Sequence, residues 1–531
     1  MLKEHPKGLL GAALSNMGER FGFYTMMAIL VLFLQAKFGL SGTHAGIIYS
    51  VFYFSIYALA FVGGLIADKS RKYKSTILVG LIIMAIGYVM LGFPTPTPTP
   101  NKILFLIISC FGLLTIAFGN GLFKGNLQAL VGQMYDNNEY SHKRDAGFSL
   151  FYMFINVGAL FAPFTAIGIR NWWLARHSYE YDANLPALCH QHVENTLEST
   201  KVFGTGVLDQ AQGLAEKVFG LDPVSKFQNL ATEVGGQTEN LTSFANDYLN
   251  VFTSGFHYAF IAAIGAMIVS LAIFLFNKKH FPNVDKKVAA TAASQDTEIK
   301  MDAKEIKQRL YALLAVFGVV IFFWFSFHQN GLTLTMFARD YTDLSGIKIN
   351  LGFVTIQGAE IFQSINPFFI VFLTPIIMAL FGWLRARGKE PSTPKKIAIG
   401  MGIAAAAYVV MVIGSYDLPL YKDIQSSPLD NSLKVTPLLL IGTYFILTVA
   451  ELFISPLGIS FVSKVAPPHL QGLMQGGWLG ATALGNQLLF IGAILYENTP
   501  LWLTWTVFVV ACLLSMITML AMLKWLEKIT K

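Results

Sequence analysis

The chain has 531 residues, of which 54% are hydrophobic, 14% aromatic and only 13% charged. Soluble domains carry charges on about a quarter of their residues, so this composition predicts an integral membrane protein. The formal net charge of +7 comes largely from Lys and Arg in short loops between apolar runs. This pattern is typical of cytoplasmic loops and argues against a protein that binds nucleic acid.

Twelve apolar runs, each long enough to cross a hydrocarbon core of about 30 Å, follow one another along the chain. They are expected near residues 8–35, 44–67, 75–93, 102–131, 147–170, 256–277, 308–338, 351–385, 394–414, 435–465, 471–496 and 499–525. The sequence therefore predicts an all-α membrane protein with 12 transmembrane helices. Two groups of six with a long loop between them are typical of the major facilitator fold.

Polar segments divide the chain into two bundles. We expect a six-helix bundle over residues 1–277, a linker over 278–307 and a second six-helix bundle over 308–531. Lys and Arg follow the second, fourth, sixth and eighth runs, which predicts that these loops and both termini lie on the cytoplasmic side of the cell membrane. The polar insert at 171–255, with ten acidic and four basic residues, is expected on the opposite side, with a short amphipathic helix near 207–221.

Targeting and cysteine patterns exclude several other classes. The first apolar run lacks a small-residue cleavage site, so we expect it to remain as the first span and not to be a cleaved signal. Cys110 and Cys512 lie in apolar runs and Cys189 lies alone in the insert, which predicts neither a disulfide framework nor a metal cluster. The residues show no nucleophile and base in an arrangement typical of an enzyme.

The first run contains an acid and a base side by side. Each charged side chain costs about 2.5–3.5 kcal/mol at the centre of a spanning helix. Asn16, Glu19, Arg20 and Tyr24 follow helical spacing, which predicts that they share one face. Our hypothesis is that this face lines a polar cavity where protons and a charged solute are exchanged. The alternative is a structural ion pair that joins two helices.

Two further runs combine glycines with a charged residue. The second run ends with Gly63-Gly64 and Asp68. The glycines permit close helix packing, and Asp68 is predicted to act as a gate or, alternatively, to close a structural turn. The fourth run places Lys124 among small residues. A buried lysine needs a carboxylate, so Lys124 is expected to pair with Glu19 or with a solute carboxylate, unless it extends to the inner surface.

Aromatic clusters with single polar residues mark the fifth and seventh runs. Tyr152 and Asn156 lie in the fifth run, where the asparagine is expected either to accept from a charged amino group or to join two helices. The seventh run holds Trp324 and His328. His328 is a candidate proton carrier because histidine changes charge most readily near neutral pH. A neutral structural histidine is the alternative, and Trp324 is expected to form an apolar wall.

Prolines interrupt the eighth and tenth runs. Asn366 precedes Pro367, and Glu451 is followed by Ser455 and Pro456. A proline inside a spanning helix frees a backbone carbonyl and kinks the helix, which suits a hinge or a polar site. Glu451 is predicted to meet a positive group on the solute. Together with the lysine of the fourth run, in the other half, it would hold a zwitterion at both ends.

In chain order, these segments resemble the proton-dependent oligopeptide transporter family of the major facilitator superfamily. The matching segments are Glu19-Arg20-Phe21, Gly63-Gly64 with Ala67-Asp68, Gly121 to Lys124, Phe148 to Gly158, Phe323-Trp324 with Gln329, Gln363 to Pro367, Glu451 to Gly458, and Gly477-Trp478. The resemblance covers nearly all of the chain except residues 171–255. It implies import of di- and tripeptides by proton symport with alternating access, with protons as the coupling ion and no other cofactor.

The resemblance also implies roles for individual residues. Glu451, Asn156 and Asn366 would hold the peptide amino end, and Lys124 would meet the carboxyl end. The proton-coupling residues are expected to be Glu19, Arg20, Lys124 and His328. The expected substrate-binding residues are Tyr24, Lys124, Tyr152, Asn156, Trp324, Asn366, Glu451, Ser455 and Trp478. The expected gating residues are Asp68, Pro367 and Pro456.

Three positions depart from the family's pattern. Asn16 stands where the family has a second glutamate, Met27 where it has an arginine for the peptide carboxylate, and His328 where it has an acid. Lys124 is therefore the one evident cation for a carboxylate. A second interpretation stays open, namely a facilitator for another peptide-like or amphipathic cationic solute with altered or lost proton coupling. In either case we expect a monomer in the lipid bilayer.

Overall fold

The computed structural model describes residues 5–70, 72–135, 139–140, 144–197, 222–236, 239–282, 303–352, 354–467 and 470–530. These residues are almost entirely helical, and a small antiparallel hairpin joins β1 (Ile349–Asn350) to β2 (Thr355–Ile356). Twelve helical stretches of the described chain are long and apolar enough to cross a membrane. The predicted all-α architecture with twelve spans is confirmed.

Six of these stretches precede the polar linker, and we call them the first half. They and their short companions are α1 (Gly8–Phe38), α2 (Gly42–Ser70), α3 (Tyr73–Gly92), α4 (Lys102–Met134), α5 (Arg144–Arg176), α6 (Leu185–Val193), α8 (Pro223–Glu233), α9 (Leu241–Asn277) and the 3₁₀ turn η3 (Lys278–His280). The remaining six stretches form the second half. Its helices are α11 (Ala303–Phe327), η5 (His328–Gly331), α12 (Thr333–Asp340), η6 (Ala359–Ser364), α13 (Ile365–Ala386), α14 (Thr393–Gly414), α15 (Tyr421–Ile424), η7 (Asn431–Leu433), α16 (Pro437–Val465), α17 (Gln471–Gln487), α18 (Leu489–Asn498), α19 (Leu501–Ala521) and α20 (Leu523–Thr530).

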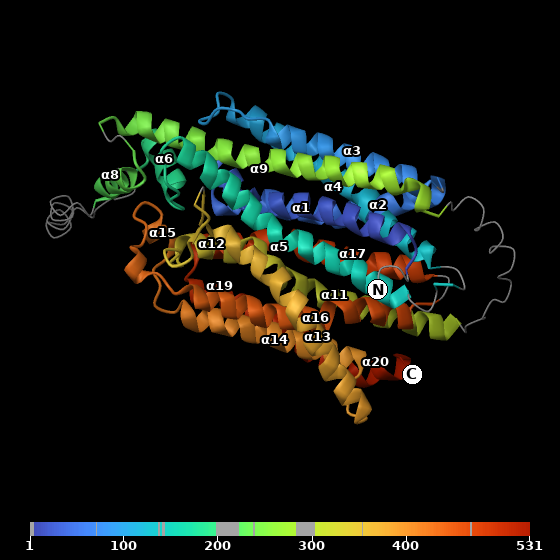
Figure 1. Ribbon diagram of the computed structural model, residues 1–531. Coiled ribbons are helices and arrows are strands. Elements are labelled where there is room, and N and C mark those ends of the chain that lie inside the picture. The colour runs from blue at the N-terminus through green and yellow to red at the C-terminus, as the bar shows by residue number, and fades with distance from the viewer. Residues whose placement is uncertain are drawn as a thin grey trace.

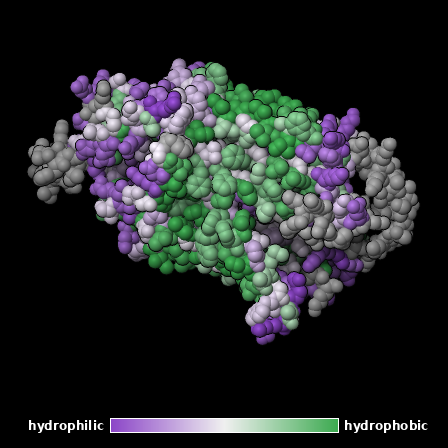
Figure 2. Space-filling view, in the orientation of Figure 1, coloured by the Kyte–Doolittle hydropathy of each residue, from purple (hydrophilic) through white to green (hydrophobic). Residues whose placement is uncertain are grey.

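The spans run side by side along one direction (Figure 1). Both termini lie at one end, which we call the terminal end, and α6, α8 and α15 lie at the other, which we call the insert end (Figure 1). Figure 2 shows a broad hydrophobic surface between two hydrophilic ends. Large apolar side chains of the spans are exposed, for example Phe111 at 61% and Phe372 at 58%. Lipid chains would cover such side chains, so the protein is a multi-pass membrane protein.

Close packing places α4 against α2 and α3. A Cβ atom added to Gly80 of α3 would lie 2.7 Å from the carbonyl oxygen of Gly119 in α4, and one added to Gly119 would lie 2.6 Å from that of Gly80. Neither position has room for a side chain. Gly63 of α2 meets Gly121 of α4 in the same manner, as the sequence predicts. This contact holds the segment of α4 that carries Lys124 beside α2.

Three boundaries differ from the sequence prediction. α9 begins at Leu241 and not near residue 256, so the insert between the spans is shorter than expected. The seventh span is interrupted after Phe327 by the turn η5 before α12 continues. The eighth span begins at Ala359, because residues 349–356 contain the β-hairpin. Short apolar runs do not distinguish a hairpin from the start of a helix, which explains the last difference.

The prolines take different positions in their helices. Pro456 lies inside α16, as predicted. Pro367 lies in the first turn of α13, where a missing N–H removes no intrahelical hydrogen bond, and the interior position expected of it belongs to Pro375. The predicted helix at 207–221, most of the linker and the side chain of Asp68 lie outside the described residues.

Candidate functional site

A cavity of about 460 Å³, which we call the central cavity, lies between the two halves. Residues of α1, α2, α4 and α5 line it from the first half, and residues of α11, η5, η6, α13, α16 and α17 line it from the second. The lining includes all nine residues predicted to bind substrate, which are Tyr24, Lys124, Tyr152, Asn156, Trp324, Asn366, Glu451, Ser455 and Trp478. The fold thus gathers polar groups from widely separated parts of the chain into one site.

Lys124 supplies positive charge on the first-half wall. Its ammonium nitrogen lies 4.9 Å from the ring centroid of Tyr57, which is a cation–π contact. Among the described residues, no carboxylate oxygen lies within 4.0 Å of this nitrogen. The expected pair with Glu19 is therefore not formed in this structure, and a solute carboxylate is the remaining partner of the two that the sequence suggested.

Glu19 lies behind the wall and does not border the cavity. It is fully buried, and Arg20 donates to both of its oxygens, from Nε to Oε2 at 2.5 Å and from Nη2 to Oε1 at 2.6 Å. Asn120 donates a third hydrogen bond to Oε1 at 2.8 Å. Along α1 the cavity begins at the level of Arg20. Arg20 and Tyr24 therefore line it, whereas Asn16 and Glu19, expected on the same wall, do not.

Arg20 is a second cation on this wall. Its guanidinium carbon lies 4.6 Å from the ring centroid of Phe23, and the residue lines the cavity while it is bonded to Glu19. The sequence singles out Lys124 as the one evident cation for a carboxylate, because Met27 occupies the family's arginine position. Met27 does line the cavity, and so does Arg20. The expectation of a single cation is therefore wrong, because the Arg20 guanidinium is a second one.

Glu451 supplies the negative charge of the second-half wall. Asn366 donates from Nδ2 to Glu451 Oε2 at 2.8 Å and to the Thr448 hydroxyl oxygen at 3.0 Å. The amide orients the carboxylate without neutralising it, and no basic side chain in the described part of the chain forms an ion pair with Glu451. On the other wall, Asn156 donates to the backbone carbonyl of Tyr152 at 3.1 Å, which holds its amide at the cavity.

His328 lies on the η5 turn that interrupts the seventh span. Its Nδ1 atom is 2.5 Å from Oδ1 of the fully buried Asn486, so Nδ1 carries the proton and donates it to this bond. The imidazole stacks on Trp324 and contacts Tyr53, each at a centroid distance of 4.8 Å. These neighbours hold the ring at the wall in one orientation. Proton transfer by His328 stays a prediction. Its partner Asn486 is not expected from the sequence, since no pattern singles it out.

A row of tyrosines on α2 is the part of the wall that the sequence interpretation misses. Tyr49, Tyr53 and Tyr57 all line the central cavity. Their spacing of four residues places them on one helical face, so the spacing is a usable signal in the sequence. We call these three residues the tyrosine row. Their rings add a large contact surface that also carries polar hydroxyl groups.

The central cavity therefore presents opposite charges on opposite walls. Lys124 and Arg20 lie on one wall and Glu451 lies on the other. A buried charge without its counterpart is costly, so a ligand with a carboxylate at one end and an ammonium at the other would stabilise both walls. The described residues contain no group of three or more His, Cys, Asp or Glu side chains placed to hold a metal ion.

Twelve spans in two halves around a polar cavity at their interface define a secondary transporter of the major facilitator type. The sequence model of the POT family matches residues 74–189 and 283–501. These segments make up more than half of the chain, and the chain belongs to this family.

Relatives align with the chain over nearly its full length. The peptide transporter YePEPT of Yersinia enterocolitica is 29% identical over 495 residues, which cover 91% of this chain and 86% of the relative. Dipeptide and tripeptide permease B of Salmonella typhimurium is 25% identical over 482 residues, which cover 90% and 84%. A crystal structure of a POT peptide transporter in complex with sulfate matches with a TM-score of 0.69 at 21% identity, over 99% of this chain and 96% of that one. At this sequence identity, the structural similarity supports the fold alone.

Proposed function

We propose that this chain imports di- and tripeptides across the cell membrane by symport with protons. The observation that carries the proposal is the pair of charged walls. Lys124 on one half and Glu451 on the other have no ion-pair partner among the described residues. A peptide with free ends brings the carboxylate and the ammonium that these walls lack. The relatives named as peptide transporters and as dipeptide and tripeptide permeases support this substrate class.

The size and lining of the central cavity suit short peptides with varied side chains. A volume of about 460 Å³ falls in the usual range of small-molecule sites. The amino group would meet Glu451 and Asn366, and the carboxylate would meet Lys124 or Arg20. The peptide side chains would lie against the tyrosine row. Aromatic rings offer contact area without demanding one pattern of hydrogen bonds, so we propose broad acceptance of peptide sequences.

Proton coupling is proposed to act through Glu19 and Arg20. A peptide carboxylate would compete with Glu19 for the Arg20 guanidinium, which borders the cavity. Once Arg20 turns to the peptide, Glu19 is buried without its cation, and its protonated form is then favoured. Peptide binding and proton uptake would therefore stabilise each other, as linked binding requires. His328 would tune the same cycle from the opposite wall.

The orientation and assembly of the chain are part of the proposal. Both termini would lie in the cytoplasm and the insert outside the cell. Basic residues such as Lys278, Lys279 and Arg387, which follow α9 and α13 near the terminal end, support this orientation under the positive-inside rule. The groups that would hold the peptide all come from one chain, so we propose a functional monomer.

Uptake of a labelled dipeptide into proteoliposomes tests the proposal. With an inside-alkaline pH gradient we expect accumulation against the dipeptide gradient, and without it only equilibration. Glu451→Gln should lower uptake about 100-fold, because loss of one partner of a buried charge contact costs about 2–5 kcal/mol. Glu390, which is bonded to Arg385 and Lys396 outside the central cavity, supplies the control Glu390→Gln, which should transport normally. Absence of uptake for every dipeptide tried would contradict the proposal and favour an amphipathic cationic solute.

A further inference from the structure

Buried polar contacts join the two halves at the insert end. Arg170 of α5 forms an ion pair with Glu360 of η6, and both side chains are fully buried. The neighbouring Asn171 donates from Nδ2 to the backbone carbonyls of Thr355 and Gln357 at 2.8 and 3.0 Å. Any opening of the insert end must separate these groups.

Glu497 and Arg339 make two more contacts between the halves. Glu497 of α18 accepts from the N–H groups of Gly42 and Thr43, at 2.5 and 3.0 Å, where α2 begins. Arg339 of α12 donates from Nη1 to Oε1 of Gln35 in α1 at 2.6 Å. The insert end is therefore closed by three separate sets of polar contacts.

The insert adds a helix to this closed end. α6 rests on the first half, where Leu185, Leu188 and Cys189 are fully buried. Nε2 of His190 lies 2.7 Å from the carbonyl oxygen of Ala36 in α1. Burial lowers the pKa of the His190 imidazole, so the ring is neutral near pH 7 and Nε2 donates its proton to this carbonyl.

Gly39 makes room for α6 at the end of α1. Its φ angle of +57° lies in the left-handed region, and a Cβ atom there would lie 3.0 Å from Nδ1 of His190. Glycine is the residue that meets both conditions at low cost. The backbone of α1 is therefore shaped to carry α6 as part of the first half.

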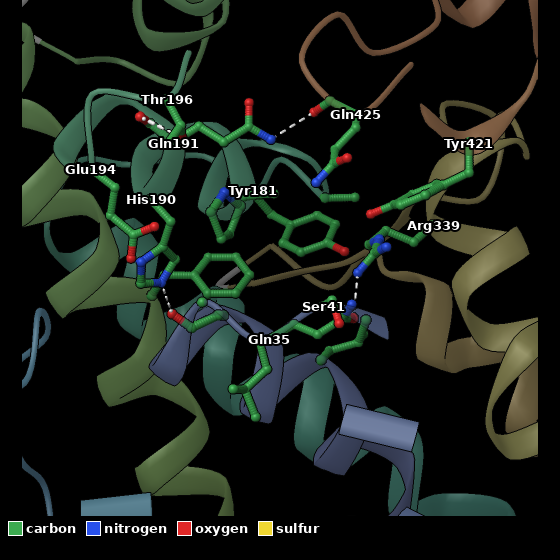
Figure 3. Close-up of a pocket in the computed structure, with 18 residues that line it drawn as sticks. Gln35, Ser41, Tyr181, His190, Gln191, Glu194, Thr196, Arg339, Tyr421 and Gln425 are labelled. Atoms are coloured by element: carbon green, nitrogen blue, oxygen red, sulfur yellow. Dashed lines mark hydrogen bonds between the residues drawn. The ribbon is translucent and has the colours of Figure 1, made fainter. Parts of the chain in front are cut away.

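The insert also contacts the second half. Gln191 of α6 donates from Nε2 to the backbone carbonyl oxygen of Gln425 at 3.0 Å, next to α15 (Figure 3). Tyr181, which precedes α6, lies with its ring centroid 4.0 Å from the guanidinium carbon of Arg170. The insert thus reaches the second half through Gln191, while Tyr181 packs on Arg170, the first-half partner of the buried ion pair with Glu360.

A second cavity of about 230 Å³, which we call the insert-end cavity, lies beside α6 between the two halves. Arg339 borders it (Figure 3), but this guanidinium already donates to both oxygens of Asp340, at 2.6 and 2.9 Å, and to Gln35. Its charge is therefore satisfied before any ligand arrives. We interpret this cavity as the space left where α1, α6 and α15 meet, and not as a binding site.

We propose that α6 is a gate element, which moves with the first half and whose contact with Gln425 breaks each time the insert end opens. The inference rests on the proposed transport function, because alternating access requires that end to open. The bond from Gln191 to Gln425 adds stability to the closed state, while the ring of Tyr181 on Arg170 fixes the insert to the first half. The acidic insert, whose composition reveals no role, thereby shifts the balance between the closed and open states.

Cross-linking tests whether the contact must break. In a Cys110→Ala background, cysteines replace Gln191 and Gln425, and a short bifunctional thiol reagent that dithiothreitol can release joins them. We expect at least a tenfold loss of dipeptide uptake on cross-linking and recovery on release. Dipeptide binding to the cross-linked protein in detergent should survive, because the cross-link leaves the terminal end free to open. Uptake within twofold of the unlinked protein would overturn the proposal.

A pair within the first half supplies the matched control. His192 Nε2 and Thr242 Oγ1 are 3.1 Å apart. His192 belongs to α6 of the insert and Thr242 to the start of α9, so both lie in the first half. A cross-linked His192→Cys, Thr242→Cys variant should keep its uptake within twofold. An equal loss of uptake for both pairs would overturn the proposal, because the effect would then not depend on linking the two halves.

A distance measurement keeps the test independent of the substrate. Spin labels on the cysteines at positions 191 and 425 should report two separations by pulsed electron resonance, one for the closed state and a longer one for the open state. Labels at positions 192 and 242 should report one. If dipeptides are not taken up, the proposed function fails, but these distances still show whether α6 separates from the second half. A single separation for the 191 and 425 labels would overturn it.

Discussion

The central cavity and the insert-end cavity lie between the same two halves, yet their charges are arranged differently. In the central cavity, Lys124 and Glu451 lie on opposite walls, and the described residues offer neither of them an ion-pair partner. In the insert-end cavity, Arg339 is neutralised by Asp340. That carboxylate also accepts from the hydroxyl group of Tyr496 at 2.8 Å.

This difference distinguishes charged residues that bind a ligand from charged residues that stabilise the fold. A buried charge whose partner belongs to the protein is part of the fold, and loss of the partner leaves that charge uncompensated. A charge that borders a cavity without a counterpart carries a cost that a ligand removes, so it marks a binding site. Arg20 stands between the two cases, since it is paired with Glu19 and also lines the central cavity. A group with two possible partners is suited to couple two binding events.

The largest effect should be a loss of stability at the insert-end cavity. Asp340→Asn leaves the buried Arg339 guanidinium without its counterion and should lower the free energy of unfolding by about 3 kcal/mol. The thermal midpoint of the purified protein in detergent measures this change. Glu451→Gln should leave that midpoint unchanged or higher. If Asp340→Asn kept its stability but lost a ligand, the insert-end cavity would be a binding site and the comparison would fail.

An intermediate effect should appear at the central cavity. Lys124→Gln should raise the KM for a free dipeptide about 30-fold, since a charged hydrogen bond in a buried site is worth about 2 kcal/mol. With a dipeptide amidated at its C-terminus, the variant and the native protein should have similar KM values, because no carboxylate remains to be recognised. Equal losses for both substrates would show that Lys124 supports the wall without meeting the carboxylate.

The smallest effect should come from the ring beneath Lys124. Tyr57→Leu removes the cation–π contact and should raise the KM about threefold, which corresponds to about 0.5–1 kcal/mol. Tyr57→Phe keeps the ring face and should leave the KM nearly unchanged in the same uptake assay. A larger loss for Tyr57→Phe than for Tyr57→Leu would mean that the hydroxyl group, and not the ring, contributes to binding.

Hydropathy accounts for the spans and for most of the binding wall. In lipid, backbone groups must find partners within their own segment, so each long apolar run becomes a helix. Polar side chains in such runs avoid lipid and face the protein interior. For this reason the nine residues predicted to bind substrate, which come from separate runs, all line one cavity.

Partner choice, in contrast, depends on how the helices pack. Asn120 of α4 donates to Glu19 of α1, and Lys124 of the same α4 is left to the cavity, because of distances across helices that no local pattern encodes. Asn486 meets His328 for the same reason. The contact of α6 with the second half joins residues 234 positions apart. Such contacts exist only after the two halves have come together, so composition and periodicity do not predict them.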